Sequence, residues 1–462
     1  MAMRILALGV MAACLPVGAM AQEMPGETAQ GDVAVTIYNN NLALVQDTRS
    51  LTLPAGRSRQ EFADVSAAIR PETVTLAAAG TSIVEQNFDY DLLTPEKLMD
   101  KAVGSTITII RDGVPETARV LANNGGTIVQ IGNRIEVLDD DSGRVVFGSL
   151  PANLRARPTL SITLDSVRSG ARPVTLTYLS HGLSWSADYV ALFDESAGKI
   201  DVQGWITLNN NSGTTFTNAN TILVAGAPGQ GQPSYGTTRA RPTPRPIGNS
   251  PGTESANRER LGDYYLYPLA ERTTIANAQQ KQVSFLDVAG APAAKAYYYR
   301  NGWLGQSGDA QSVDTVLRFS SSAEGGLGDA LPAGTVRVYM RDARGTPQFI
   351  GESNIGHTPM GSQIALKTGE AFDVKVQPTV VARTRIGSSR WRTEMRYKFT
   401  NARPEAVTVE FVQAGLDSWW DDTRITDESQ KSERITSDQA LWTVTVPANG
   451  EAEVTATFDT RY

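Results

Sequence analysis

Short alternations of apolar and polar residues recur along the whole chain. They are clearest in the stretch 174–226, where Trp185, Ala187 and Tyr189 occupy alternate positions and Asn209–Gly213 separates two of the runs. Successive side chains of a strand point to opposite faces of a sheet, so this period of two predicts strands. Asparagine and glycine suit the tight turns between such strands. The pattern therefore predicts antiparallel hairpins in series, which build β-sandwiches.

One segment combines a helix signal with five strand signals. Thr94 can cap a helix, Pro95 suits its first position and Glu96 complements the helix dipole. Tight turns then separate short apolar runs, so the segment 94–150 is similar to a small SH3-like barrel inserted into the larger fold. The strands expected there are 106–110, 118–121, 127–131, 134–138 and 145–147.

The composition changes in the segment 227–261, which is rich in proline, glycine, serine and arginine. It has no apolar periodicity and few aliphatic residues, so it cannot bury enough surface to fold by itself, and we expect a flexible basic loop. Alternation resumes after it and is most regular at 391–400, where apolar and charged residues take turns. Phe372, Val374 and Val376 are likewise expected to share one face of a strand.

These patterns predict an all-β protein with two antiparallel β-sandwich-like regions, a small SH3-like barrel insert and a short helix. The length of 462 residues agrees with several domains. The expected divisions are a signal peptide at 1–21, an N-terminal β region at 22–93, the barrel insert at 94–150, a central β-sandwich region at 151–226 that packs with the N-terminal region, the flexible loop at 227–261 and a C-terminal β-sandwich at 262–462.

The first 21 residues have the composition of a secretion signal. Arg4 precedes the apolar run Ile5–Leu15, which is too short to span a bilayer, and Ala19–Ala21 is a small-x-small cleavage site. Cleavage before Gln22 places the protein in the periplasm or outside the cell, with no integral membrane segment left. The alternative is a lipoprotein anchored through Cys14.

Charge and cysteine content exclude several classes of function. The formal net charge is −7, which argues against nucleic acid as a partner. Cys14 is the only cysteine, so a chain cleaved before Gln22 has no disulfide, thiol nucleophile or cysteine metal site. The only histidines, His181 and His357, accompany no zinc or nucleophile motif, and we expect both to be turn residues that bond to backbone. No metal, cofactor or catalytic residue is therefore predicted.

Several motifs, spread over most of the chain after the signal, point to one bacterial family. They are Trp185–Tyr189, Gly204–Asn209, Leu223–Gly226, Leu331–Gly334 and His357–Pro359. In these motifs the chain resembles the domain of unknown function 4139 family, which includes mucoidy-inhibitor-A-like bacterial proteins. The resemblance implies a link to the envelope or to surface polysaccharide, and it carries over no catalytic residue.

One aromatic pair marks a candidate ligand site. Trp419 and Trp420 are followed directly by Asp421 and Asp422, and aromatic rings beside carboxylates can stack on a sugar ring and bind its hydroxyls. Packing of one tryptophan in the core is the alternative explanation of the pair.

The function expected from the sequence is that of an exported, non-catalytic β protein. Its partner would be a glycan or an envelope protein, in a binding or scaffold role. A carboxylate-dependent glycan hydrolase is the first alternative, because folding can bring two distant carboxylates together. Association with the outer membrane is the second, since the chain ends in the aromatic-rich strand Phe458–Tyr462.

Overall fold

The protein is an all-β molecule, as the sequence predicted. Its structure is a computed structural model that describes residues 28–89, 93–139, 142–149, 151, 154–226, 250–255, 258–305, 308–418 and 421–461. These residues form thirty strands in four sheets, together with the single helix α1 and the 3-10 turn η1 (Pro71–Thr73). The expected signal peptide, with Cys14, and residues 227–249 of the expected loop lie outside the described residues.

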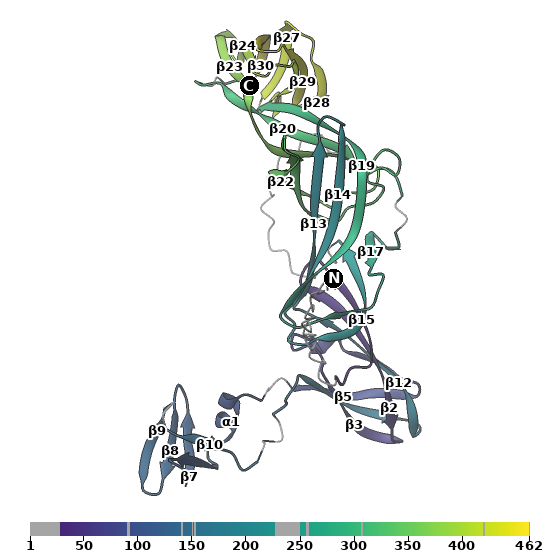
Figure 1. Cartoon of the computed structure of the whole chain (residues 1–462), viewed down its shortest axis with the longest axis vertical. Coiled ribbons are helices and arrows are strands. Elements are labelled where there is room, and N and C mark those ends of the chain that lie inside the picture. The colour runs from purple at the N-terminus through teal and green to yellow at the C-terminus, as the bar shows by residue number, and fades with distance from the viewer. Residues whose placement is uncertain are drawn as a thin grey trace, which may run out of the picture.

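Two sheets form the lower end of the elongated molecule, which we call the foot (Figure 1). An eight-stranded and a three-stranded sheet share one apolar core, to which Phe62, Ile162 and Leu176 contribute fully buried side chains. The strands of the larger sheet are β1 (Asp32–Tyr38), β2 (Leu42–Leu53), β4 (Thr75–Ala77), β12 (Gly170–Ser180), β15 (Phe216–Ala225), β16 (Arg260–Leu261), β17 (Tyr264–Pro268) and β18 (Thr273–Ile275). Those of the smaller sheet are β3 (Gly56–Ala63), β5 (Thr81–Asp89) and β11 (Thr159–Ser166).

A 14-stranded sheet forms the middle and the upper end of the molecule (Figure 1). Its central path runs β22-β21-β13-β14-β19-β20-β23-β24-β30-β27-β26, and β25, β28 and β29 extend it. The strands are β13 (Leu183–Asp194), β14 (Lys199–Asn210), β19 (Gln279–Asn301), β20 (Gln311–Ser320), β21 (Gly334–Arg341), β22 (Pro347–Ile355), β23 (Gln363–Gly387), β24 (Arg390–Asn401), β25 (Val407–Gln413), β26 (Asp417–Ser418), β27 (Asp421–Glu428), β28 (Glu433–Thr436), β29 (Gln439–Val446) and β30 (Gly450–Arg461).

Two unusually long strands join the middle of the molecule to its upper end. β19 has 23 residues and β23 has 25, whereas strands of globular proteins usually have 3–10. The first part of each strand packs in the core that continues from the foot, with Leu286 and Leu366 among its members. The later parts pack in a second core, with Tyr297 and Val376. The two cores are therefore connected by continuous backbone.

The second core is built from stacked aromatic rings. Tyr397, Phe399, Phe411 and Trp442 are completely buried there, and the ring centroids of Tyr397 and Phe411 lie 4.3 Å apart. Along β24 these buried residues alternate with exposed charged ones, as the sequence predicted for 391–400. This alternation fixes the register, since a shift by one residue would bury the charges.

One predicted face is wrong. Val374 and Val376 are fully buried, but Phe372 is 88% exposed and the neighbouring Ala371 is buried instead. The pairing of β20 with β23 changes register between Ser312 and Asp314, which disturbs the alternation at this point. A second departure is that three described strand pairs are parallel: β1 with β15, β13 with β21, and β19 with β25.

The insert comprises residues 94–149 and lies beside the foot (Figure 1). Thr94 caps its helix as predicted, because its Oγ1 accepts a 3.1 Å hydrogen bond from the backbone N of Lys97. The five predicted strands are present, in the spatial order β10-β6-β7-β8-β9. Its elements are α1 (Pro95–Lys101), β6 (Thr106–Arg111), β7 (Val114–Asn123), β8 (Thr127–Ile131), β9 (Arg134–Leu138) and β10 (Arg144–Val146).

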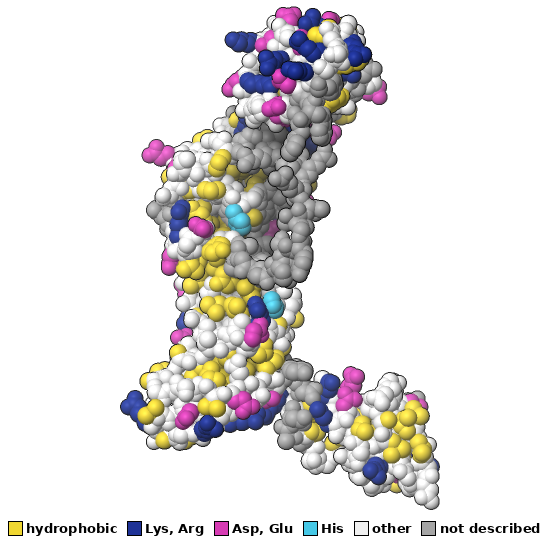
Figure 2. Space-filling view, turned by 180° about the vertical axis from the view of Figure 1, so that it is seen from behind, with side chains coloured by type: hydrophobic (Ala, Val, Ile, Leu, Met, Phe, Trp, Pro, Cys, Tyr) yellow, Lys and Arg dark blue, Asp and Glu magenta, His cyan; other side chains and the backbone are white. Residues whose placement is uncertain are grey.

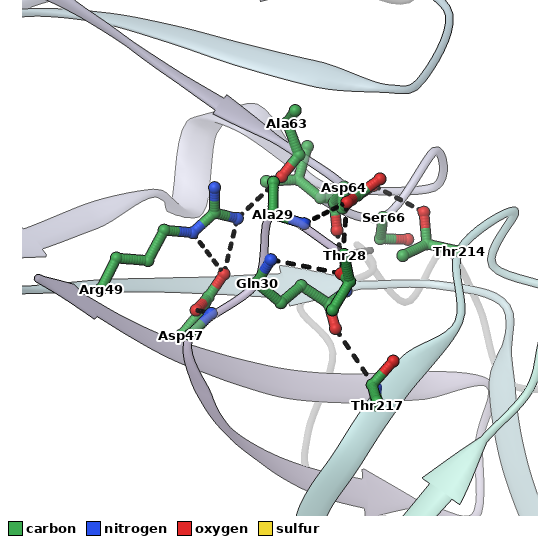
Figure 3. Close-up of polar contacts among 12 residues, drawn as sticks. Thr28, Ala29, Gln30, Asp47, Arg49, Ala63, Asp64, Ser66, Thr214 and Thr217 are labelled. Carbon is green, nitrogen blue, oxygen red and sulfur yellow. Dashed lines mark hydrogen bonds and ion pairs between the residues drawn. The ribbon is translucent and has the colours of Figure 1, made fainter. Parts of the chain in front are cut away.

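A polar network fastens the first described residues to the foot (Figure 3). Oδ2 of the buried Asp64 accepts hydrogen bonds from the backbone N of Ala29, at 2.7 Å, and from Nη1 of Arg157, at 2.8 Å. Asp47 accepts from Nε and Nη2 of the equally buried Arg49, at 2.9 and 2.7 Å. Each buried charge here has a partner within the chain. We therefore interpret the network as a structural attachment of the first described residues to the foot.

The C-terminal end of the expected loop is attached to the sheets. Ser250 forms an isolated β-bridge with Gln363. Arg258 makes a forked ion pair with Asp329, and its guanidinium lies 4.3 Å from the ring centroid of Tyr267. No helix among the described residues is long and apolar enough to cross a membrane.

Candidate functional site

The predicted aromatic pair lies outside the described residues. Trp419 and Trp420 fall between β26 and β27, which pair antiparallel with Asp417 opposite Asp422. Asp422 is exposed and forms an ion pair with Arg424 at 3.2 Å. The backbone of Asp421 pairs with that of Ser418. The charge of Asp422 is therefore paired with that of Arg424 on the same strand.

A pocket opens beside this hairpin. Its lining comes from the residues that follow β19, from β23, β24, β27 and β30, and from the segment before β26. The lining residues are Trp303, Leu304, Arg383, Trp391, Thr393, Gly415, Thr423 and Thr460. Two tryptophans, Trp303 and Trp391, are thus among the residues that line this pocket.

Strand register builds the floor of this pocket. Trp391 of β24 lies opposite Thr460 of β30, which in turn lies opposite Thr423 of β27. Residues directly opposite one another share a face of the sheet, so an indole and two hydroxyls form one row. Thr423 and Thr460 are buried, and their Oγ1 atoms lie 2.9 Å apart in a hydrogen bond.

A glycine and an arginine hold the Trp303 wall in place. Gly415 has φ +78°, and a Cβ added to it would lie 2.7 Å from the carbonyl oxygen of Gly302, so only glycine permits this approach. Arg383 donates from Nη2 to the carbonyl oxygen of Leu304 and from Nε to Oγ1 of Thr393, the latter at 3.2 Å. The loop that carries Trp303 is thereby tied to β23 and β24.

The exposure and chemistry of this pocket suit a polar ligand with an apolar face. Trp303 remains 53% exposed, so its ring is available to a ligand. Trp391 is half-buried. Indole rings offer a rigid flat surface with a donor at one edge, and threonine and arginine add hydrogen-bonding groups. None of the eight lining residues is a carboxylate.

A second cavity lies where the two cores meet, and the two cations at its edge are already paired. Phe193, Tyr297 and Met340 supply apolar walls, with Lys295 and Arg403 at the edge. Nζ of Lys295 lies 2.9 Å from a carboxylate oxygen of Glu195. The hydrogen bond from Arg403 lowers the pKa of the Glu405 carboxyl, and the same contact raises the pKa of Arg403. Both cations at the edge of this cavity are therefore engaged by carboxylates.

Both histidines behave as predicted for turn residues. Nδ1 of His181 lies 3.0 Å from the carbonyl oxygen of Asn41. Nδ1 of His357 accepts a 3.2 Å hydrogen bond from the backbone N of Ala333, and burial lowers the pKa of this imidazole. Across the part of the chain that the structure describes, no three histidine, cysteine or acidic residues are grouped closely enough to hold a metal ion.

The pocket lies within a segment that matches a known family. A family model described as a domain of unknown function (DUF4139) matches residues 174–462, which is more than half of the chain. The chain belongs to this family. The resemblance seen in the sequence motifs is therefore confirmed, and all eight lining residues fall inside the matched range. No curated protein matches the chain.

The sequence did not indicate any of the eight lining residues as site residues, and the tryptophan pair that it did indicate lies outside the described residues. Trp391 could be placed on one face of a strand by its alternation, but its neighbours Thr423 and Thr460 depend on register across three strands. Trp303 follows β19 in a segment without periodicity. Its exposure next to a glycine at positive φ could not be recognised from sequence alone.

Proposed function

We propose that this protein is an exported, non-catalytic envelope protein that binds a polysaccharide through the pocket of Trp303 and Trp391. The residues 1–21 direct export, and the mature chain begins at Gln22 in the periplasm or at the cell surface. We also propose that Trp419 and Trp420 take part in binding the polysaccharide. The elongated molecule then presents this site at one end.

The observation that supports this function is the row of Trp391, Thr460 and Thr423 beneath the half-exposed Trp303. The C–H face of a sugar ring packs on an indole, while its hydroxyls exchange hydrogen bonds with threonine and arginine. Because β24, β27 and β30 hold this row, the pocket is largely preformed, and binding costs little ordering entropy.

The lack of a carboxylate among the eight described lining residues favours binding over hydrolysis at this pocket. A retaining or inverting glycosidase needs two carboxyl groups on either side of the scissile bond. Of the two carboxylates predicted from the sequence, Asp422 is paired with Arg424. A glycan bound here would therefore be held without being cleaved.

The direct test is binding of the chain from Gln22 to an array of bacterial glycans. Trp303→Ala and Trp391→Ala should each weaken binding of any glycan that the unmodified chain retains, by about tenfold or more, since each removes one stacking surface. The matched control is Phe349→Ala, because Phe349 is 55% exposed against 53% for Trp303 but lies on β22.

Two outcomes would contradict the proposal. One is binding that Phe349→Ala weakens as much as Trp303→Ala. The other is a complete absence of glycan binding by a chain whose circular dichroism shows folded β structure. Release of reducing ends from a retained glycan would support the hydrolase alternative instead.

A further inference from the structure

Exposed apolar side chains are concentrated in the insert. Across the described residues, 17 large hydrophobic side chains are exposed, and six of them belong to the insert, although it spans only 94–149 of the 462 residues. The six are Val103, Val114, Leu121, Ile135, Val137 and Val146. Figure 2 shows hydrophobic side chains gathered on the surface of this part of the molecule. Exposed apolar groups in such numbers mark interaction surfaces.

The two most exposed of these side chains lie next to each other on β9. Ile135 is 68% exposed and Val137 is 67% exposed, and both point to the same face of the strand. Register places Val137 opposite Ile128 of β8, which lies opposite Ala122 of β7. An apolar row therefore crosses three strands and ends at β9.

β9 is also an edge of its sheet. Among the described strands it pairs with β8 alone, so the backbone groups on its other side have no ladder partner. Unpaired edges invite pairing with another strand, and proteins usually protect them. Charged residues occur on both edge strands: Arg57, Arg59 and Glu61 on β3, and Arg134 and Glu136 on β9. On β9 they alternate with the exposed Ile135 and Val137.

The geometry points to β9 as an interface with a second copy of this chain, in which the two β9 strands pair antiparallel about Ile135. This inference is independent of the tryptophan pocket and of any glycan. In that register Ile135 faces Ile135 of the second copy, and Arg134 faces Glu136 of the second copy on both sides of the symmetry axis. Opposite charges placed across a strand pair stabilise it.

Charge selects this register over its neighbours. Sliding the copies by one residue each in either direction preserves the strand alternation but brings Glu136 opposite Glu136, or Arg134 opposite Arg134. Like charges directly opposite each other destabilise a strand pair. A strand of this composition is therefore complementary to itself in one register, which an unrelated partner strand would match only by accident.

The charged side chains of β9 belong to an ion-pair network within the insert, in which Arg134 also contacts Glu136 of its own strand. Arg111 contacts Glu136 at 2.7 Å and Arg134 contacts Glu116 at 2.9 Å, and the hydrogen bond from Arg111 lowers the pKa of the Glu136 carboxyl. Both residues of β9 are thus charged and oriented on one face, opposite to that of Ile135 and Val137. Pairing of two copies would extend this ion-pair network across the interface.

The absence of cysteine after Cys14 allows a clean test of the register. In the chain from Gln22, Ile135→Cys should give a disulfide-linked dimer under mild oxidation, because opposite Cα atoms lie about 5.5 Å apart, within the range for a disulfide. Val137→Cys should cross-link far less, since in this register it faces Asn133 of the second copy. Val114→Cys, 61% exposed and away from β9, is the control for random collision.

Sedimentation velocity of the unmodified chain supplies the second readout. We expect a concentration-dependent dimer that Glu136→Arg weakens by about tenfold, because both Arg134–Glu136 contacts become repulsive. The double exchange Arg134→Glu/Glu136→Arg restores complementarity and should restore the dimer. Circular dichroism of each variant confirms that the insert remains folded.

Three results would overturn the inference. They are a monomer at every concentration up to the solubility limit, equal cross-linking of Ile135→Cys and Val114→Cys, and failure of the folded double exchange to recover what Glu136→Arg loses. Dimerisation that persists without change in Glu136→Arg would place the interface elsewhere on the molecule.

Discussion

The second core, at the upper end of the molecule, and the core of the insert differ in size and in the residues that they bury. In the second core, Phe411 lies between Tyr397 and Trp442, with centroid distances of 4.3 and 5.2 Å, and all three rings are buried. The core of the insert is entirely aliphatic among its buried members: Ala102, Ile107, Ile109, Ala118, Val120, Val129 and Ile131. The larger core encloses its apolar residues, whereas the smaller one leaves many outside.

This difference shows why exposure has a different meaning in the two regions. A small module has a large surface for its volume, so it cannot bury every apolar residue that its strands carry. Two of the six exposed apolar residues of the insert lie on β9, where we infer an interface. In the second core the rings of Tyr397, Phe411 and Trp442 are enclosed, whereas the exposed Trp303 belongs to a loop that Gly415 and Arg383 hold in place.

The largest effect is expected from emptying the aromatic core. Trp442→Ala removes a fully buried ring and its 3.0 Å hydrogen bond from Nε1 to the carbonyl oxygen of Gln430, so it should lower the free energy of unfolding by about 4 kcal/mol. Trp303→Ala is the matched control and should cost less than about 1 kcal/mol. Urea unfolding followed by circular dichroism measures both, and equal losses would contradict the assignment of Trp303 to the surface.

The next effect should be confined to the insert. Ile109→Ala creates a cavity in a core of seven buried residues and should destabilise the insert by about 3 kcal/mol. The two larger cores share no member with it, so hydrogen exchange should rise in 94–149 alone. Faster exchange in β24 or β30 would show that the insert folds together with the rest.

A smaller, pH-dependent effect is expected at Asp459. Arg392 donates to its carboxylate from Nε and Nη2, at 2.8 and 3.0 Å, and these hydrogen bonds lower the pKa of Asp459 although partial burial opposes them. The stabilisation is therefore complete above the unfolded pKa of about 4 and is lost as pH falls through the lower folded value.

Asp459→Asn should consequently cost about 1 kcal/mol near neutral pH, since Arg392 is partly exposed to solvent, and less below about pH 3. Denaturant midpoints of both proteins across this range measure the difference. Glu136→Gln in the insert is the comparison and should have a smaller effect, because Glu136 is more exposed than Asp459. A loss that grows as the pH falls would contradict the role of the ion pair.

The smallest effect is expected on the exposed edge of the insert. Val137→Ser should change the free energy of unfolding by less than about 0.5 kcal/mol at low protein concentration, because Val137 is 67% exposed. Guanidinium unfolding of dilute protein measures this value. A loss comparable to that of Ile109→Ala would show that Val137 belongs to the core and not to an interface.

Local sequence signals predicted much of the fold. The cap at Thr94, the five strands of the insert and the alternation of β24 depend on neighbours within a few residues, and all are present. The face of Phe372 was predicted wrongly, because a register shift against β20 is set by a distant strand. The continuity of β19 and β23 through two cores could not be read from alternation. The division of the chain at residue 262 stays a prediction.

The candidate site divides in the same way. The local sequence predicted a site at Trp419 and Trp420. The described pocket is instead lined by residues up to 157 positions apart, from Trp303 to Thr460. Their meeting depends on the path of β23, β24, β30 and β27. The resemblance to the family identified the matched segment without indicating a site.

The most direct test of the account is fluorine NMR of the chain from Gln22, with its seven tryptophans labelled as fluorotryptophan. Each signal is assigned by replacing one tryptophan at a time, and a glycan retained on the array is then titrated in. We expect the signals of Trp303 and Trp391 to shift with one common binding curve, while that of the buried Trp442 stays unchanged. Shifts that spare Trp303 and Trp391 would contradict a polysaccharide site in this pocket.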